Sequence, residues 1–171
     1  MEPPDQTCIK LNKDGSFMEA TNKAGGGGII RDHSGNMLVA FCTPLDAHSA
    51  LEAELMPMIQ GLDIAKDFGL PIWLESDAEQ AIKLINGMVW GSACVRQVVA
   101  KLSLLKRQLK FRATFIHREG NKAADLLARK GLEQDTDLRM QHNSASRDLL
   151  DLILRDAMGV HHIRDLEGDE H

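Results

Sequence analysis

The sequence is short of cysteine and of long apolar runs. Its three cysteines, Cys8, Cys42 and Cys94, are far apart and form no C-x-x-C pair, which argues against a disulfide framework or a zinc knuckle and fits a reducing compartment. No apolar run approaches the roughly 18 residues that span a bilayer. The opening MEPPDQT has none of the basic-then-apolar character of a signal peptide. We therefore expect an intracellular protein, nuclear or cytoplasmic, that is not secreted and has no membrane partner.

Basic residues are fewer than acidic ones, 20 against 25. The 171 residues carry a formal net charge of −5, which argues against a protein that holds nucleic acid by overall charge, although a local basic face could still contact phosphates. With 43% hydrophobic and 26% charged residues, the composition is that of one globular domain with a tail, large enough to bury its own core. A monomer is the default expectation.

A third absence concerns nucleotide-binding loops. The run from Gly25 to Gly28 could cradle a phosphate, but no Gly-Lys-Ser/Thr follows it and it has no G-x-G-x-x-G register into a helix. We therefore interpret these glycines as a flexible entry to a strand.

The patterns that are present predict an α/β fold. Alternating apolar and polar side chains predict strands over 8–17, 27–32 and 36–42, with a tight turn at Gly35 and Asn36, and these strands would form an antiparallel meander. Apolar spacing and short buried runs predict the remaining elements: helices over 48–68, 77–87, 92–108 and 121–131, and strands over 71–76 and 111–117. The last helix has Asn121 at its N-cap and ends at Gly131. The predicted order is βββαβα(α)βα.

Three segments are expected along the chain. Residues 1–7 are a polar, proline-bearing leader, residues 8–132 are the folded domain, and residues 133–171 hold a polar linker and a short C-terminal helix. That helix, from about Leu149 to Val160, is predicted to be an accessory element outside the main core.

Acidic residues occupy positions where ligands gather. Asp14 and Asp77 lie at predicted strand ends, and Asp125 lies in the first turn of the last helix, where an acid also has the ordinary role of facing the positive end of the helix dipole. Carboxylates brought together repel one another unless divalent cations neutralise them, and hard oxygen ligands suit Mg²⁺ or Mn²⁺. Two such ions roughly 4 Å apart are a known device for phosphodiester hydrolysis.

A fourth acid comes from the first long helix, and two residues compete for the place. On a helical wheel Glu52 and Glu54 flank the apolar face equally, so the helical pattern does not choose between them.

Four phrases occur in order across this predicted fold: LNKDGS, AELMPMIQGL, WLESDAEQAI and FIHREGNKAADLLA. Together they resemble the type 1 ribonuclease H family, and look closest to its plant ribonuclease H-like, reverse-transcriptase-associated domains, found alone or at the ends of non-LTR retrotransposon polyproteins. The resemblance runs from about Lys10 to Leu132. It implies a ribonuclease H-like fold, with a five-stranded mixed sheet of three antiparallel strands and then two parallel ones, flanked by helices. It also implies Mg²⁺-dependent cleavage of the RNA strand of an RNA–DNA hybrid.

The resemblance assigns residues to this activity. The acids that would bind two Mg²⁺ ions, with Mn²⁺ as a substitute, are Asp14, Glu54, Asp77 and Asp125. This choice takes Glu54, of the phrase AEL, over Glu52, which is interpreted as a solvated flank. Residues expected near the hybrid are Gly15, Ser16, Ser49, Ala50 and Glu79, although ordinary turn and cap roles would explain each of them equally well.

Two departures from the family pattern bear on activity. The family's histidine in a longer loop before the last acid has no match, because the loop here is short and His117 ends a predicted strand; Arg118 or Glu119 could substitute. Pro57 stands inside the first long helix, where it would remove a hydrogen bond and crowd the carbonyl of Ala53, beside Glu54. These departures leave a rival interpretation, a domain that keeps the fold and binds nucleic acid or protein without cleaving. Another nuclease of the same superfamily, such as a resolvase, is disfavoured by the AEL and AAD phrases.

A basic stretch offers a possible phosphate contact. Its members are Arg96, Lys101, Lys106, Arg107, Lys110 and Arg112. Such a run is more often a solvated helix face, and any binding through it should be weak and salt-sensitive.

Overall fold

A computed structural model of the chain describes residues 8–87, 89 and 91–156. The predicted leader lies outside the described residues, as does the part of the predicted C-terminal helix beyond residue 156. Within the described part of the chain, no helix is long and apolar enough to cross a membrane.

The core of the fold is one six-stranded sheet in the order β5-β4-β1-β2-β3-β6. Its strands are β1 (Ile9–Met18), β2 (Lys23–Arg31), β3 (Met37–Leu45), β4 (Ile72–Ser76), β5 (Phe111–Phe115) and β6 (Leu138–Met140). The first three strands pair antiparallel, while β4 pairs parallel with β1 and β5 pairs parallel with β4. The predicted α/β ribonuclease H-like fold is confirmed, with β6 as an additional antiparallel strand on the edge of β3.

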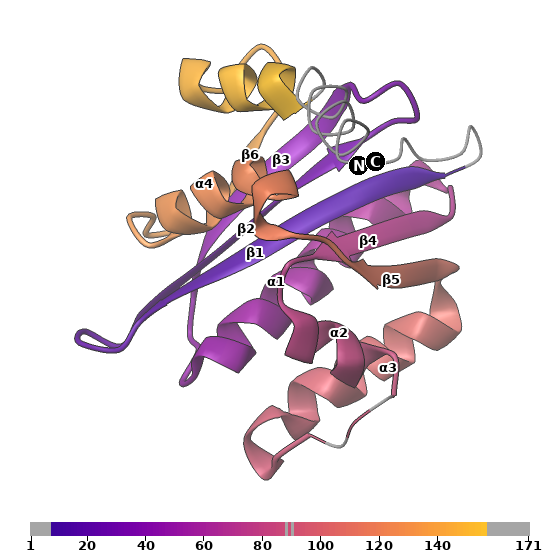
Figure 1. Cartoon of the computed structure of the whole chain (residues 1–171), viewed down its shortest axis with the longest axis vertical. Coiled ribbons are helices and arrows are strands. Elements are labelled where there is room, and N and C mark those ends of the chain that lie inside the picture. The colour runs from indigo at the N-terminus through magenta and orange to yellow at the C-terminus, as the bar shows by residue number, and fades with distance from the viewer. Residues whose placement is uncertain (1–7, 88, 90, 157–171) are drawn as a thin grey trace, which may run out of the picture.

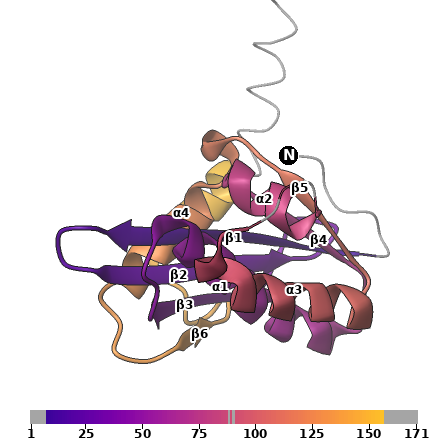
Figure 2. The ribbon, with the colours of Figure 1, turned by 90° about the horizontal axis from the view of Figure 1, so that it is seen from below.

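The helices fall close to their predicted places. They are α1 (Ala50–Ala65), extended by the 3-10 turn η1 (Lys66–Phe68), then α2 (Glu79–Ile85), η2 (Ala93–Val95) leading into α3 (Arg96–Gln108), η3 (Arg118–Gly120), α4 (Lys122–Gly131) and a last helix over 147–156. In Figure 1, α4 and this last helix lie together, away from α1, α2 and α3. Figure 2 shows the strands side by side, from β5 and β4 through β1, β2 and β3 to β6, with α1 and α3 in front of them.

The run from Gly25 to Gly28 allows α1 and α4 to pack closely against the sheet. Its interpretation as a flexible entry to a strand is wrong. Gly25 to Gly28 lie inside β2 and are buried. A side chain at Gly27 would come within 2.5 Å of Leu127 in α4, and one at Gly26 would come within 2.5 Å of Pro57 in α1. Because successive strand residues face opposite sides, α1 and α4 cover opposite faces of β2, and both approach its backbone more closely than a side chain would allow.

Pro57 has a packing role in this arrangement. It is buried within α1, which continues through it, and its ring lies where a side chain of Gly26 would otherwise be. The helix therefore accommodates the proline without ending, and the contact with β2 uses the space that Gly26 leaves open.

The turn before β3 partly matches its prediction. Gly35 has a φ of +84°, as expected, whereas Asn36 does not have positive φ; among described non-glycine residues only Asn22 does. Asn36 instead donates its backbone N–H to the Asp32 carboxylate at 3.0 Å. The aspartate side chain therefore stabilises the turn without a second left-handed residue.

The chain after Gly131 packs more closely than a linker would. β6 lies within the stretch expected to be a polar linker, and Leu149 in the last helix is only 1% exposed, against Ile29, Leu127 and Met140. Arg31 of β2 also pairs with Asp156 at 3.1 Å. The described part of the C-terminal helix is therefore not outside the core, because one leucine of its amphipathic pattern completes the apolar cluster on the α4 side.

Candidate metal centre

Three predicted acids converge where β1, α1 and β4 meet. Asn12 of β1 is paired with Glu75 of β4 in a parallel register, so Asp14 and Asp77, two residues further along, arrive at the same place. Glu54 comes from α1, which touches β1 so closely that a side chain at Gly15 would lie 2.0 Å from the carbonyl oxygen of Ala53. One carboxylate oxygen from each of Asp14, Glu54 and Asp77 lies within 4.8 Å of the other two.

Burial and like charge both oppose ionisation in this cluster. Burial, followed by the charges of Glu54 and Asp77, raises the pKa of Asp14 to about 8. Burial and the charge of Glu54 also raise the pKa of Asp77 above its ordinary value. Both shifts have the causes expected of carboxyl groups that are buried close together. The donor set of carboxylate oxygens fits a hard divalent cation such as Mg²⁺ or Mn²⁺, which would relieve this repulsion.

Cationic side chains also border the cluster. The Nζ of Lys13 lies 2.7 Å from Glu54 Oε2 and 2.6 Å from the Glu54 carbonyl oxygen. Arg118 and Arg129 line the same pocket as the acids, and Arg118 is one of the charges that lower the pKa of Asp77. The site is therefore not purely acidic.

The fourth predicted acid lies at the edge of this arrangement. Asp125, in the first turn of α4, lines the pocket that contains the other three acids, but it is not a member of the group within 4.8 Å. Its carboxylate pairs with Arg129, one turn further along α4, at 2.9 Å. The pocket, of about 580 Å³, is lined by Asp14, Gly15, Ser16, Phe17, Glu54, Asp77, Arg118, Asp125 and Arg129.

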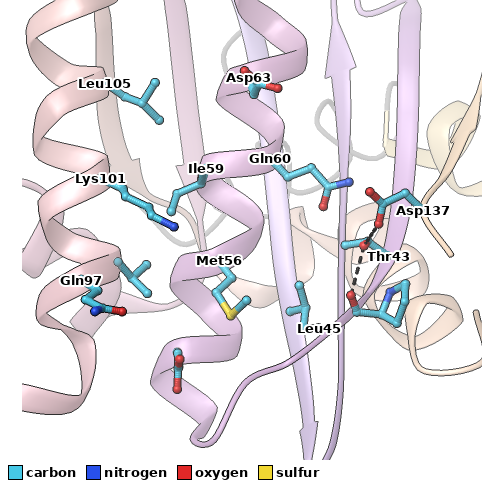
Figure 3. A pocket seen from close by; sticks show the side chains of 13 residues that line it. Thr43, Leu45, Met56, Ile59, Gln60, Asp63, Gln97, Lys101, Leu105 and Asp137 are labelled. Atoms are coloured by element: carbon cyan, nitrogen blue, oxygen red, sulfur yellow. Dashed lines mark hydrogen bonds between the residues drawn. The ribbon is translucent and has the colours of Figure 1, made fainter. Parts of the chain in front are cut away.

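The geometry distinguishes Glu54 from Glu52. Glu52 accepts a hydrogen bond from the backbone N–H of His48 at 3.0 Å, while its own N–H donates to Ser49, the N-cap of α1. It lines a second pocket, formed by residues of β3, α1 and α3, rather than the acidic one. Figure 3 shows this second pocket, with Leu45 of β3, Met56 of α1 and Gln97 of α3 among its labelled residues. Glu52 is thus a helix-capping residue, which the interpretation as a solvated flank did not anticipate, and only Glu54 faces Asp14 and Asp77.

Comparison with known protein families places this geometry in context. The family described as "Reverse transcriptase-like" matches residues 12–131. The chain belongs to this family. The matched range begins just before Asp14 and includes all four predicted acids, Asp14, Glu54, Asp77 and Asp125.

Relatives of this reverse transcriptase-like chain carry ribonuclease H names. A protein of Arabidopsis thaliana named "Putative ribonuclease H protein" is 29% identical over 122 residues, covering 70% of this chain and 20% of the relative. The chain thus matches about a fifth of that relative's length. This coverage limits the comparison to one region of the longer protein.

Solved structures support the same fold. Ribonuclease H1 of Halobacterium salinarum superposes with a TM-score of 0.68 at 22% identity, covering 74% of this chain and 98% of that one. LC11 ribonuclease H1, solved in complex with an RNA/DNA hybrid, gives a TM-score of 0.68 at 22% identity, covering 73% and 96% of the two chains. At these identities the likeness shows the fold.

The residues predicted near a substrate divide into two groups. Gly15 and Ser16 line the acidic pocket. Ser49 and Glu79 do not, because Ser49 caps α1 and Glu79 pairs with Lys83 at 3.4 Å on α2, while Ala50 is exposed in the first turn of α1. The ordinary cap and ion-pair roles therefore account for Ser49 and Glu79.

Other predicted candidates lie outside the pocket. His117 follows β5 and lies edge-to-face with Phe115, with ring centroids 5.2 Å apart. Within the basic stretch, Lys106 donates to the Ile85 carbonyl, and Arg112 lies over the Trp73 ring at 4.0 Å. The side chains of Lys106 and Arg112 thus make contacts within the fold.

Sequence reasoning missed two residues beside the acids. Asn121 stands at the N-cap of α4 as predicted, but its side chain makes no cap bond and instead donates to the Lys13 carbonyl at 2.9 Å. Lys13 itself is fully buried and reaches Glu54. The available signal was the alternation of β1, in which a lysine occupies an inward position between Leu11 and Gly15.

Proposed function

We propose that the protein hydrolyses the RNA strand of an RNA–DNA hybrid endonucleolytically and with Mg²⁺. The observation that supports this most directly is the convergence of Asp14, Glu54 and Asp77 within 4.8 Å. Membership of the reverse transcriptase-like family and the likeness to a ribonuclease H1 solved with an RNA/DNA hybrid agree with that chemistry. We also propose that residues 8–132 are the catalytic unit. The described residues after 132 would stabilise this unit by packing against it.

The roles of the residues follow from their positions. Asp14, Glu54 and Asp77 would hold the cations, and Asp125 would contribute from the pocket edge. When bound, such ions supply Lewis-acid activation of water and stabilisation of the leaving oxygen. Gly15 and Ser16 lie on the pocket wall, where the sugar–phosphate edge of a hybrid would approach.

A second candidate is a nucleic-acid-binding module that does not cleave. It is favoured by one observation, that Glu54 and Asp125 are each paired with a cationic side chain, Lys13 and Arg129 respectively. Ligands already neutralised in this way bind divalent cations less readily.

The test is cleavage of a labelled RNA–DNA hybrid beside single-stranded RNA, duplex RNA and duplex DNA, with Mg²⁺ and with EDTA. We expect cleavage of the hybrid RNA strand only, and only with Mg²⁺. Glu54→Gln should abolish it, whereas the matched variant Glu52→Gln, two residues away in the same helix, should cleave as the wild type does. Retarded migration of the hybrid without cleavage would favour the non-cleaving module.

A further inference from the structure

The most unusual residue of the site is a lysine. Lys13 is 0% exposed, and a buried ammonium group is costly unless its charge and donors are matched. The Lys13 Nζ donates two hydrogen bonds to Glu54, one to its carboxylate and one to its backbone carbonyl oxygen.

The backbone fixes this contact. Lys13 and Gly15 share the face of β1 that meets α1. Because Gly15 lets the backbone of α1 come against β1 at Ala53, the start of α1 lies within reach of Lys13. A longer separation between helix and strand would leave the ammonium group buried without an acceptor.

We infer that Lys13 is an internal counter-cation that occupies the electrostatic place of a metal ion, so that divalent cations must compete with it for Glu54. This inference rests on the proposed function, because it concerns the same three acids. The ammonium group neutralises one carboxylate of the cluster and points it toward Asp14 and Asp77. Lys13 is therefore a positioning residue for Glu54 that also limits metal affinity.

The influence of Lys13 extends beyond Glu54. The pKa of Asp14 is raised overall, but Lys13 is the first of the influences that lower it, and it also lowers the pKa of Asp77. A unit charge about 5 Å from a divalent ion, at an effective dielectric constant of about 20, changes affinity by a factor of ten or more. Removing the lysine charge should therefore strengthen metal binding rather than weaken it.

The experiment is calorimetric titration of the full-length chain with Mn²⁺, and then with Mg²⁺, without nucleic acid. Lys13→Met removes the charge at nearly constant length, and Lys13→Gln does so while keeping a hydrogen-bond donor, in case the first variant does not fold. Lys66→Met is the matched control, because it removes an exposed lysine paired with Asp63 at the far end of α1. A cooperative thermal transition identifies the folded variants.

We expect folded Lys13 variants to bind Mn²⁺ at least about tenfold more tightly than the wild type, and Lys66→Met to be unchanged. Equal or weaker binding by the Lys13 variants would overturn the inference and leave the proposed function standing. Binding by the variants alone would support the inference in its strongest form. If no form binds Mn²⁺ or Mg²⁺, the metal site of the proposed function fails and the inference fails with it.

Discussion

Two buried carboxylates on neighbouring strands meet opposite surroundings. Glu75 of β4 pairs with Lys10 Nζ at 2.9 Å and accepts from Asn12 Nδ2 at 3.4 Å. Asp14 of β1 faces Glu54 and Asp77, and their charges add to burial in raising its pKa. The surroundings of Glu75 compensate its charge, whereas those of Asp14 oppose ionisation.

This difference in surroundings indicates that Glu75 serves the fold and that Asp14 serves a reaction. A buried pair is strongly destabilised when one partner is lost, because the other charge stays buried and unpaired. A carboxyl group among like charges costs stability, and such groups concentrate at functional sites. Stability and cleavage should therefore respond in opposite senses to changes at the two positions.

The largest effect is expected from Asp14→Asn. Under the proposed function, cleavage of the hybrid should fall on the order of 1,000-fold, because a metal ion supplies several kcal/mol of transition-state stabilisation. Unfolding of the metal-free protein in urea at neutral pH should require on the order of 1 kcal/mol more free energy, because the amide is neutral without having to bind a proton on folding, as the Asp14 carboxyl group must. Undiminished cleavage, or a loss of metal-free stability, would contradict this view of Asp14.

The same residue predicts a pH dependence in EDTA. The pKa of Asp14 in the folded protein is about 8, above the ordinary 3.8, so between these values the folded state holds a proton that the unfolded state has lost. The stability contributed by this group therefore falls as pH rises, by up to about 1.4 kcal/mol per pH unit. Urea unfolding from pH 5 to pH 8 should show the advantage of Asp14→Asn over the wild type growing with pH. A constant difference would refute the shift.

The opposite result is expected from Glu75→Gln. This change preserves shape but leaves the buried ammonium of Lys10 without its carboxylate partner, at a cost on the order of 3 kcal/mol in unfolding free energy. Cleavage per folded molecule should stay near the wild-type value, measured below the thermal transition. An unchanged unfolding free energy for Glu75→Gln would contradict the view that Glu75 serves the fold.

A change without charge tests the C-terminal helix. Leu149→Ala removes a leucine that is 1% exposed, and should cost about 2 to 3 kcal/mol in unfolding free energy. Leu154→Ala, in the same helix but 60% exposed, is the matched control and should change it by less than about 0.5 kcal/mol. Equal effects of the two variants would show that the helix is an accessory element, as its sequence suggested.

Much of the fold could be predicted because local patterns and family phrases agreed. The alternation of β1 and β3 and the helical spacing of α1 and α3 predicted the order of the elements. The four family phrases predicted how the strands pair in the sheet. The glycine run of β2 was misinterpreted because its cause is a contact with α1 and α4, which are distant in sequence. β6 was missed because three residues are too short for alternation to register.

The candidate site was predictable to the extent that it repeats a family pattern. The phrases pointed to Asp14, Glu54 and Asp77, which do converge. The phrase LNKDGS contains Lys13 but assigns it no role, because the role of this residue depends on how closely β1 approaches α1. Helical periodicity could not separate Glu52 from Glu54, because both flank the same apolar face and only the neighbouring strands distinguish them.

The smallest effect is expected from Asp125→Asn, and it decides how Asp125 differs from Asp14. The ion pair with Arg129 is partly exposed, with side chains 35% and 62% accessible, so its loss should change stability by only about 0.3 to 0.5 kcal/mol. If Asp125 also serves the metal site, cleavage should fall about tenfold or more, because a neutral amide is a poorer ligand for a hard cation. Arg129→Gln breaks the same ion pair without removing a carboxylate, so its stability change should match while its cleavage falls less. Equal cleavage by the two variants would reduce Asp125 to an ordinary first-turn acid of α4, facing the helix dipole and its own arginine.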